Sequence, residues 1–336
     1  MAGNDSSDRK SKACTIILPV FNEAEVVEKT VRTISGVFAA AGVKPEILLV
    51  DDGSRDGTWD RVCGLHESEA KVKGVRFSRN FGKESAIAAG LENAGGDCVI
   101  IMDSDLQHPP ETALEMFMLW RDGGYDIIEG VKISRQRESM ALKICAGLFY
   151  QFLRSLAAID LRNASDFKLL DRAVVDIIRQ MPERQTFFRA MTGWTGMKTS
   201  TVFFEVQLRA GGVTKWSPLA LFKLAIDSIS AYSSIPLHLV TFAGFGFFLF
   251  AVILAIQTLY MKISGMAVEG FTTVILLLLV IGAILMISLG IIGIYIAKIY
   301  NEVKFRPRYI VAETFTETET ETETETETET DAGADG

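Results

Sequence analysis

Apolar and polar positions come in alternating blocks along the first 130 residues, and each block has the spacing of one strand or one helix. Short apolar runs predict strands at Cys14–Val20, Glu46–Val50, Val72–Phe77, Asp97–Met102 and Asp126–Glu129. Stretches with a helical repeat predict helices at Glu23–Ala41, Asp56–Ser68, Lys83–Asn93 and Pro110–Arg121. Strands that are apolar throughout are typical of a sheet covered on both faces. The alternation therefore predicts an open, parallel α/β sheet with right-handed crossovers.

Two long uncharged stretches follow this region. Leu239–Met261 contains 23 residues and Phe271–Ala297 contains 27, and neither includes Asp, Glu, Lys, Arg or His. A bilayer core needs about 20 apolar residues per helix, so both stretches are predicted to span a membrane; two buried core helices are the alternative. Lys262–Gly270 between them is long enough only for a tight hairpin. Basic residues flank the pair at Lys215, Lys223, Lys298, Lys304, Arg306 and Arg308, which places both chain ends in the cytoplasm.

Two further segments have amphipathic helical spacing, Glu138–Ile159 and Ser217–Ser234. They fit ordinary surface helices and also helices that lie in the membrane interface, and their closeness in sequence to the apolar stretches favours the interface. The alternating Thr-Glu repeat at Thr316–Thr330 is too acidic and too uniform to pack, so it is predicted to be disordered.

These patterns predict four parts. They are a disordered N-terminus (1–12), a cytoplasmic α/β domain with interfacial helices (13–235), a two-helix transmembrane hairpin (236–300) and a cytoplasmic tail (301–336). The net charge of −8 comes from the tail, because ten of the 42 acidic residues follow Arg308. The remainder has 32 acidic and 34 basic residues, a net charge of +2. No concentrated basic surface is predicted, which argues against a nucleic-acid partner.

Candidate ligand-binding residues lie at the end of each of the first four predicted strands. They are Pro19, Phe21, Asn22 and Glu23; Asp51, Asp52, Gly53 and Ser54; Arg79, Asn80, Gly82 and Lys83; and Asp103, Asp105, Gln107 and His108. In open α/β sheets, ligands bind beyond the carboxyl ends of the strands. We therefore expect these four sets to converge on one binding site.

The type of ligand is narrowed by motifs that are present and absent. The first strand is not followed by G-x-G-x-x-G, and the chain has no G-x-x-x-x-G-K-[ST], so a dinucleotide site and a P-loop are disfavoured. Asp103 and Asp105 are alternate residues that can point the same way, and Gln107 adds an amide oxygen. This is a hard oxygen set suited to Mg²⁺ or Mn²⁺. The start of a helix at Pro109-Pro110 is the simpler alternative for the two acids.

Four ordered motifs resemble glycosyltransferase family 2. They are Ile17-Leu-Pro-Val-Phe-Asn-Glu23, Val50-Asp-Asp-Gly-Ser-Arg-Asp-Gly-Thr58, Arg79-Asn-Phe-Gly-Lys83 and Met102-Asp-Ser-Asp-Leu-Gln-His-Pro-Pro110. The last motif and the C-terminal helix pair resemble the polyprenyl-phosphate glycosyltransferases, such as bactoprenol glucosyltransferases and dolichyl-phosphate mannose synthases. The resemblance runs from about Thr15 to Arg308 and implies a GT-A (Rossmann-like) fold.

The resemblance also implies site residues. Pro19, Asn22, Glu23 and Asp52 match the nucleotide pocket, with Asp51 as a neighbour, and Lys83 matches a residue beside the diphosphate. Asp103 matches the first acid of the metal motif, and Asp105 and Gln107 match the ligands of Mg²⁺ or Mn²⁺. Asp166 matches a position often assigned as a base, although it can equally orient an arginine or the sugar.

Basic residues between the sheet and the apolar stretches are candidates for binding the acceptor phosphate. We expect Arg209 and Lys215 to do so, in a loop that resembles the family's flexible loop, with Arg135 next. A basic face against anionic lipid headgroups is the alternative. The chain lacks the Gln-x-x-Arg-Trp motif of polymer synthases, since Gln185 is followed by Thr-Phe-Phe-Arg-Ala. We therefore expect a single sugar to be added.

The resemblance implies inverting transfer of one glucose from UDP-glucose to undecaprenyl or another polyprenyl phosphate at the cytoplasmic face of the inner (plasma) membrane. GDP-mannose or a UDP-amino sugar is the alternative donor. A non-catalytic membrane scaffold is the alternative from another class, but it predicts loss of the metal acids, and Asp103, Asp105 and Gln107 are all present. The resemblance further implies a multi-pass membrane protein, a homotetramer and a separate flippase for the product.

Overall fold

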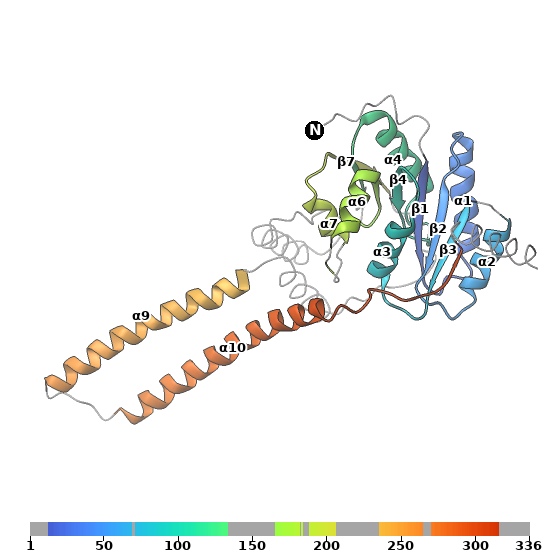
Figure 1. Ribbon diagram of the computed structural model, residues 1–336. Helices are drawn as coiled ribbons and strands as arrows, with labels where there is room; N and C mark the ends of the chain where they lie inside the picture. Colours follow the sequence, from blue (N-terminus) through green and yellow to red (C-terminus); the bar gives the residue numbers. More distant parts are fainter. Residues whose placement is uncertain are drawn as a thin grey trace, which may run out of the picture. The chain divides into compact units, whose positions relative to one another are not determined.

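The computed structural model describes residues 13–68, 71–133, 165–181, 183, 188–205, 235–264 and 270–315. The chain forms two compact units. One comprises Met1–Ile144, Ile159–Gly212 and Arg306–Gly336, and the other comprises Cys145–Ala158 and Val213–Phe305. In sequence, segments of the first unit thus precede and follow those of the second (Figure 1). The predicted domain limits stay predictions.

The first unit is built on an eight-stranded sheet in the order β7-β5-β6-β4-β1-β2-β3-β8. Its strands are β1 (Cys14–Val20), β2 (Glu46–Asp51), β3 (Val72–Phe77), β4 (Cys98–Ile101), β5 (Ile127–Lys132), β6 (Lys168–Asp171), β7 (Thr199–Phe204) and β8 (Val311–Phe315). The first five agree with the predicted strands to within a few residues. The prediction of a parallel sheet was wrong in part, because β6 is antiparallel to β4 and β5, and β8 is antiparallel to β3. The sheet is therefore mixed.

Helices cover both faces of this sheet. They are α1 (Val27–Ala40), α2 (Thr58–Ser68), α3 (Lys83–Asn93), α4 (Pro110–Gly123), α6 (Arg172–Gln180) and α7 (Phe188–Trp194). Successive side chains of a strand point to opposite faces. Accordingly Ile16 and Leu18 of β1 belong to the core under α1, α2 and α4, whereas Ile17 belongs to the core under α3, α6 and α7. The result is a three-layer α/β/α unit.

Helix α1 begins later than predicted, at Val27 instead of Glu23. The backbone N–H of Glu23 donates to Thr58 Oγ1 at 2.9 Å, and that of Ala24 donates to Asp56 Oδ2 at 3.2 Å. These bonds hold Glu23 and Ala24 against the segment that follows β2. Residues 23 and 24 therefore belong to a turn at the carboxyl edge of the sheet.

The second unit contains two long helices, α9 (Ile235–Ile263) and α10 (Phe271–Val303), which confirms the predicted helix pair (Figure 1). Among the described residues, Val280–Val303 is one stretch long and apolar enough to cross a bilayer, with a mean hydropathy of 2.5. The comparable stretch of α9, Val240–Leu254, is shorter. Crossing by α9 therefore stays a prediction. The predicted amphipathic helices and the Thr-Glu repeat lie outside the described residues.

Candidate active site

The loops that follow β1 to β4 enclose a cleft of about 320 Å³ at the carboxyl edge of the sheet. Six of the residues proposed from the sequence line it: Pro19, Glu23, Asp52, Lys83, Asp103 and Asp105. The expected convergence of the strand ends is thus observed. Parallel strands end at one edge, so the polar residues that follow them meet there.

Asn22 frames this cleft by locking two loops together. It adopts a left-handed backbone conformation with φ of 55°, which Asn tolerates better than most residues. Its N–H donates to Ser54 Oγ at 2.9 Å, and its Oδ1 accepts from the Arg55 N–H at 2.9 Å. Both polar groups of Asn22 named here serve the loop after β2, so its place in the nucleotide pocket stays a prediction.

The neighbouring acids Asp51 and Asp52 point to different partners. Asp52 accepts hydrogen bonds from the N–H groups of Phe81 at 2.6 Å and Gly82 at 2.9 Å, so it fixes the loop that leads to α3. Asp51 is fully buried and accepts from the N–H and the hydroxyl of Ser54. Burial raises the pKa of both carboxyls. Asp52 faces the cleft, whereas Asp51 supports the turn beneath it.

Four charged side chains form a chain of ion pairs that begins at the cleft, where Lys83 and Asp103 line it. Lys83 Nζ lies 2.5 Å from Asp103 Oδ1 and 3.0 Å from Asp166 Oδ2. Arg189 binds Asp166 through two parallel bonds of 2.7 and 2.9 Å, the bidentate geometry that a guanidinium offers a carboxylate. Asp166 and Arg189, far apart in sequence from the strand-end loops, are thereby joined to the metal motif.

These contacts determine the charge states of Asp166 and Lys83. Burial alone would raise the pKa of Asp166, but Arg189 and Lys83 outweigh it and hold that pKa at about 2. Burial alone would lower the pKa of Lys83, yet Asp103 and Asp166 raise it instead. At neutral pH Asp166 is therefore a carboxylate and Lys83 is a cation.

The acids of the predicted metal motif fit Mg²⁺ or Mn²⁺. Asp103 and Asp105 both line the cleft with carboxylate oxygens, the ligands such cations prefer. Asp105 Oδ1 also accepts from the Gln107 N–H at 3.0 Å, which tightens the turn. Crowding by Asp105 and Asp103 adds to the burial that raises the pKa of Glu23, so negative charge is concentrated here. Among the described residues, no three Asp, Glu, His or Cys side chains form a fuller ligand set.

His108 is a site residue to which the sequence assigned no role. The Asp103 N–H donates to its Nδ1 at 3.0 Å, so Nδ1 is the acceptor and the ring is neutral with hydrogen on Nε2. The ring stacks on Phe167 with centroids 4.6 Å apart. Burial lowers the pKa of His108, which keeps the ring neutral. His108 therefore fixes the backbone of the metal motif.

Lys168 and Arg189 were also missed as contributors to the site. Lys168 is 1% exposed, and its Nζ lies 2.5 Å from Glu129 Oε1 and 2.7 Å from Thr192 Oγ1. The Thr192 hydroxyl in turn donates to the Arg189 carbonyl at 3.1 Å. The sequence offered one weak signal, a lysine directly before the apolar pair Leu169-Leu170. The pairing of Lys168 with Glu129 depends on β6 lying beside β5, which the spacing of residues does not show.

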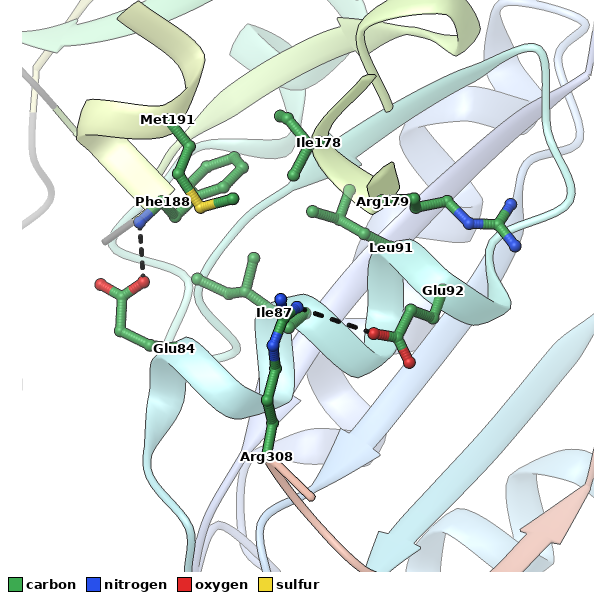
Figure 2. Close-up of a pocket in the computed structure, with 10 residues that line it drawn as sticks. Glu84, Ile87, Leu91, Glu92, Ile178, Arg179, Phe188, Met191 and Arg308 are labelled. Carbon is green, nitrogen blue, oxygen red and sulfur yellow. Dashed lines mark hydrogen bonds and ion pairs between the residues drawn. The ribbon is translucent and has the colours of Figure 1, made fainter. Parts of the chain in front are cut away.

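A second hollow lies between α3, α6 and α7 and is not a substrate site (Figure 2). Its volume is about 20 Å³, room for a water molecule, and its lining is mainly apolar. Figure 2 shows the Phe188 N–H donating to Glu84 on one side and Arg308 beside Glu92 on the other. The first contact is 2.9 Å long and the second is 3.8 Å long. This hollow is a packing defect between helices.

The basic residues expected at the acceptor end, Arg135, Arg209 and Lys215, lie outside the described residues. Their roles stay predictions, as do the individual roles assigned to the residues of the cleft.

Comparison with known proteins identifies the class of the chain. The family model for Glycosyl transferase family 2 matches residues 15–174. An uncharacterized glycosyltransferase of Synechocystis sp., sll0501, is 36% identical over 301 residues, 89% of this chain and 94% of its own. The SfII prophage-derived bactoprenol glucosyl transferase of Shigella flexneri is 32% identical over 305 residues, 89% of this chain and 97% of its own. The glucosyl-3-phosphoglycerate synthase of Mycobacterium tuberculosis aligns with a TM-score of 0.44 and 18% identity, covering 68% of this chain and 82% of that one.

Proposed function

Because the chain belongs to glycosyl transferase family 2, we propose that it transfers one glucose from UDP-glucose to a polyprenyl phosphate such as undecaprenyl phosphate. The product is polyprenyl-phosphate-glucose with inverted configuration at the anomeric carbon. The proposed acceptor and sugar are supported by the relatives named bactoprenol glucosyl transferase, which match most of this chain and nearly all of their own.

The observation that carries this proposal is the pairing of Lys83 with Asp103 at the wall of the cleft, next to Asp105. A nucleotide diphosphate needs positive charge beside it, and Lys83 supplies a cation whose raised pKa keeps it charged. Asp103 and Asp105 would hold Mg²⁺ or Mn²⁺, which supplies further charge neutralisation to the diphosphate leaving group when bound. We assign Pro19, Glu23 and Asp52 to the nucleoside end of the same cleft.

The acceptor needs little activation. The second pKa of a phosphate monoester is near 6, so a polyprenyl phosphate is mostly dianionic at pH 7. In the proposed reaction a phosphate oxygen forms a bond to the anomeric carbon, the bond from that carbon to the diphosphate breaks, and UDP leaves with the electron pair. No proton has to be removed from the nucleophile.

Asp166 is therefore assigned an orienting role instead of that of a base. A carboxyl with a pKa of about 2 is a weak base at neutral pH. Its two oxygens hold Arg189 and Lys83 in place, so it positions two cations at the site where two anionic substrates must meet. Arg135, Arg209 and Lys215 are proposed to bind the acceptor phosphate.

We further propose that α9 and α10 both cross the inner membrane, so that the lipid acceptor is delivered to a catalytic unit on the cytoplasmic side. The apolar stretch Val280–Val303 supports one crossing. A homotetramer and a separate flippase for the product complete the proposal.

The first experiment is sugar transfer in detergent with undecaprenyl phosphate, Mn²⁺ or Mg²⁺ and labelled UDP-glucose, with GDP-mannose and a UDP-amino sugar in parallel. We expect label in the lipid phase from UDP-glucose, lost with EDTA and in Asp105→Ala. Glu115→Ala is the matched control, because Glu115 is an exposed acid of α4 outside the cleft. Label from GDP-mannose alone would overturn the donor. No label from any nucleotide sugar with folded protein would support a non-catalytic scaffold.

A further inference from the structure

The chain that leaves α10 returns to the first unit and packs on it. Helix α10 ends at Val303, and residues 306–315, here called the C-terminal strap, end in β8 at the edge of the sheet (red strand in Figure 1). Arg308 Nη2 donates to the carbonyls of Met181 and Glu183 at 3.0 and 2.6 Å. The strap is therefore an integral part of the catalytic unit, a role that its sequence did not predict.

The strap contacts the end of β3, where the loop to Lys83 begins. The Ser78 N–H donates to the Ile310 carbonyl at 2.9 Å. The ring of Tyr309 stacks on Phe77 with centroids 4.7 Å apart, and Phe77 meets the edge of Phe81 at 5.8 Å. Phe81 is the residue whose N–H binds Asp52 in the cleft. One route from the strap to the donor pocket thus runs through stacked aromatic rings.

A second route runs through charges. Glu313 Oε1 lies 2.8 Å from Arg76 Nη1, and its other oxygen accepts from Trp59 Nε1 at 2.8 Å. Arg76 Nε lies 3.7 Å from Asp51 Oδ2. Within the described part of the chain, that buried Asp51 oxygen has no hydrogen-bond partner, so Arg76 is its main compensation.

The charge route ends at the loop that frames the cleft. Asp51 holds Ser54 through its other oxygen, and Ser54 Oγ accepts from the Asn22 N–H. The two routes therefore end at two loops that line the cleft, one at Asn22 between Phe21 and Glu23 and the other at the Asp52–Phe81 bond.

We propose that the C-terminal strap is a positioning element for nucleotide-sugar binding, in which Glu313 acts through Arg76 and Asp51, and Tyr309 acts through Phe77. Neither residue touches the substrate in this assignment. Because the strap is covalently continuous with α10, the shape of the donor pocket is tied to the chain that forms the membrane helix. The inference rests on the proposed function only in naming a nucleotide sugar as the ligand.

The test uses full-length protein with Glu313→Gln or Tyr309→Leu. Glu46→Gln is the matched control. Glu46 Oε2 makes an ion pair of 2.8 Å with Lys73, as long as the pair of Glu313 with Arg76, but Glu46 lies at the end of β2 that is remote from Asp51. Tyr309→Phe keeps the aromatic ring and serves as the conservative variant. Hydrogen exchange of the ligand-free proteins is followed in peptides that cover 51–58 and 78–83, and KM is measured separately for UDP-glucose and for undecaprenyl phosphate.

We expect Glu313→Gln and Tyr309→Leu to speed exchange in both peptides and to raise the KM for UDP-glucose roughly three- to tenfold. The KM for undecaprenyl phosphate should stay within twofold, a split that a general loss of folded protein would not produce. Tyr309→Phe should stay closer to the wild type than Tyr309→Leu, and Glu46→Gln should leave both peptides and both KM values unchanged.

Unchanged exchange in both peptides for Glu313→Gln and Tyr309→Leu would overturn the inference, as would an equal rise of both KM values. Hydrogen exchange is measured without substrate, so it tests the inference even if the wild type transfers no sugar from UDP-glucose. A wild type that transfers no sugar would instead contradict the proposed function.

Discussion

The charge of Asp166 can be removed with almost no change in shape by Asp166→Asn. The carboxylate is nearly buried and makes contacts of 2.7 and 2.9 Å with Arg189 and of 3.0 Å with Lys83. An amide keeps the size of the side chain but offers one acceptor and no charge. The substitution therefore removes the two ion pairs that join the metal motif to α7.

The size of the expected loss of folding stability follows from the pKa of Asp166. Asp166 titrates at about 2 in the folded protein against an ordinary value of 3.8. One pKa unit corresponds to 1.36 kcal/mol, so the shift corresponds to about 2 kcal/mol of folding stability. Because the folded pKa is lowered, this stabilisation is complete above pH 3.8 and is lost as the pH falls towards 2. Lys83 and Arg189 are 40% and 39% exposed, so screening by water reduces the expected loss to roughly 1–2 kcal/mol at pH 7.

The assay is urea unfolding in detergent at pH 7, followed by tryptophan fluorescence, to which the buried Trp59 and Trp120 contribute. A double-mutant cycle that combines Asp166→Asn with Arg189→Met isolates the coupling energy of the Asp166–Arg189 pair, since each single variant removes that interaction. Asp176→Asn is the control, because its contact with Arg179 is 3.9 Å long and exposed, and such pairs contribute at most about 1 kcal/mol. We also expect kcat to fall less than about 100-fold, the lower limit for loss of a general base.

Two results would contradict the orienting role of Asp166. One is a coupling energy near zero in the cycle. The other is a fall in kcat of about 10⁴-fold, together with loss of an acidic limb in the pH profile of the wild type. The second result would show that Asp166 takes a proton during the reaction.

Two further variants probe the support of the site. Lys168→Met leaves Glu129 without its cation and should destabilise the fold by about 3 kcal/mol in thermal or urea unfolding. Adding Glu129→Gln should recover part of that loss, and no recovery would contradict a buried ion pair. Gly53→Ala places a Cβ 2.4 Å from the Arg79 carbonyl carbon at a φ of +73°, so the donor KM should rise. Gly57→Ala has a φ of +87° without such a clash, and equal effects of the two would show that backbone strain alone is responsible.

The first half of the catalytic unit could be predicted from local pattern. Strands β1 and β3 and helix α3 have the bounds that the apolar spacing indicated. The cleft also followed from sequence, because parallel strands bring the residues after them to one edge. Asp52 and Asp103 could therefore be placed together although 51 positions separate them.

The second half could not be predicted in this way. Strand β6 has only four residues, Lys168–Asp171, too few to show a period, and a lysine at its start obscures the apolar pattern. The same limit applies to β8, where Glu313 looks like the beginning of the acidic tail until Arg76 and Trp59 are placed beside it. In both cases the charge is compensated by a partner distant in sequence, and single-sequence spacing carries no information about such partners.

The position of β8 has a consequence for the order of biosynthesis. Strand β3 ends at Phe77, and its edge partner begins at Val311, more than 230 residues later. At roughly 5–20 residues per second, the ribosome needs on the order of 10–50 s to supply that partner. During this interval both long helices, α9 and α10, are synthesised while β3 presents an unpaired edge, which is a template for wrong pairing. The nascent domain thus completes its sheet only after both long helices have been made, so a fault in translation upstream of β8 leaves an incomplete and aggregation-prone sheet.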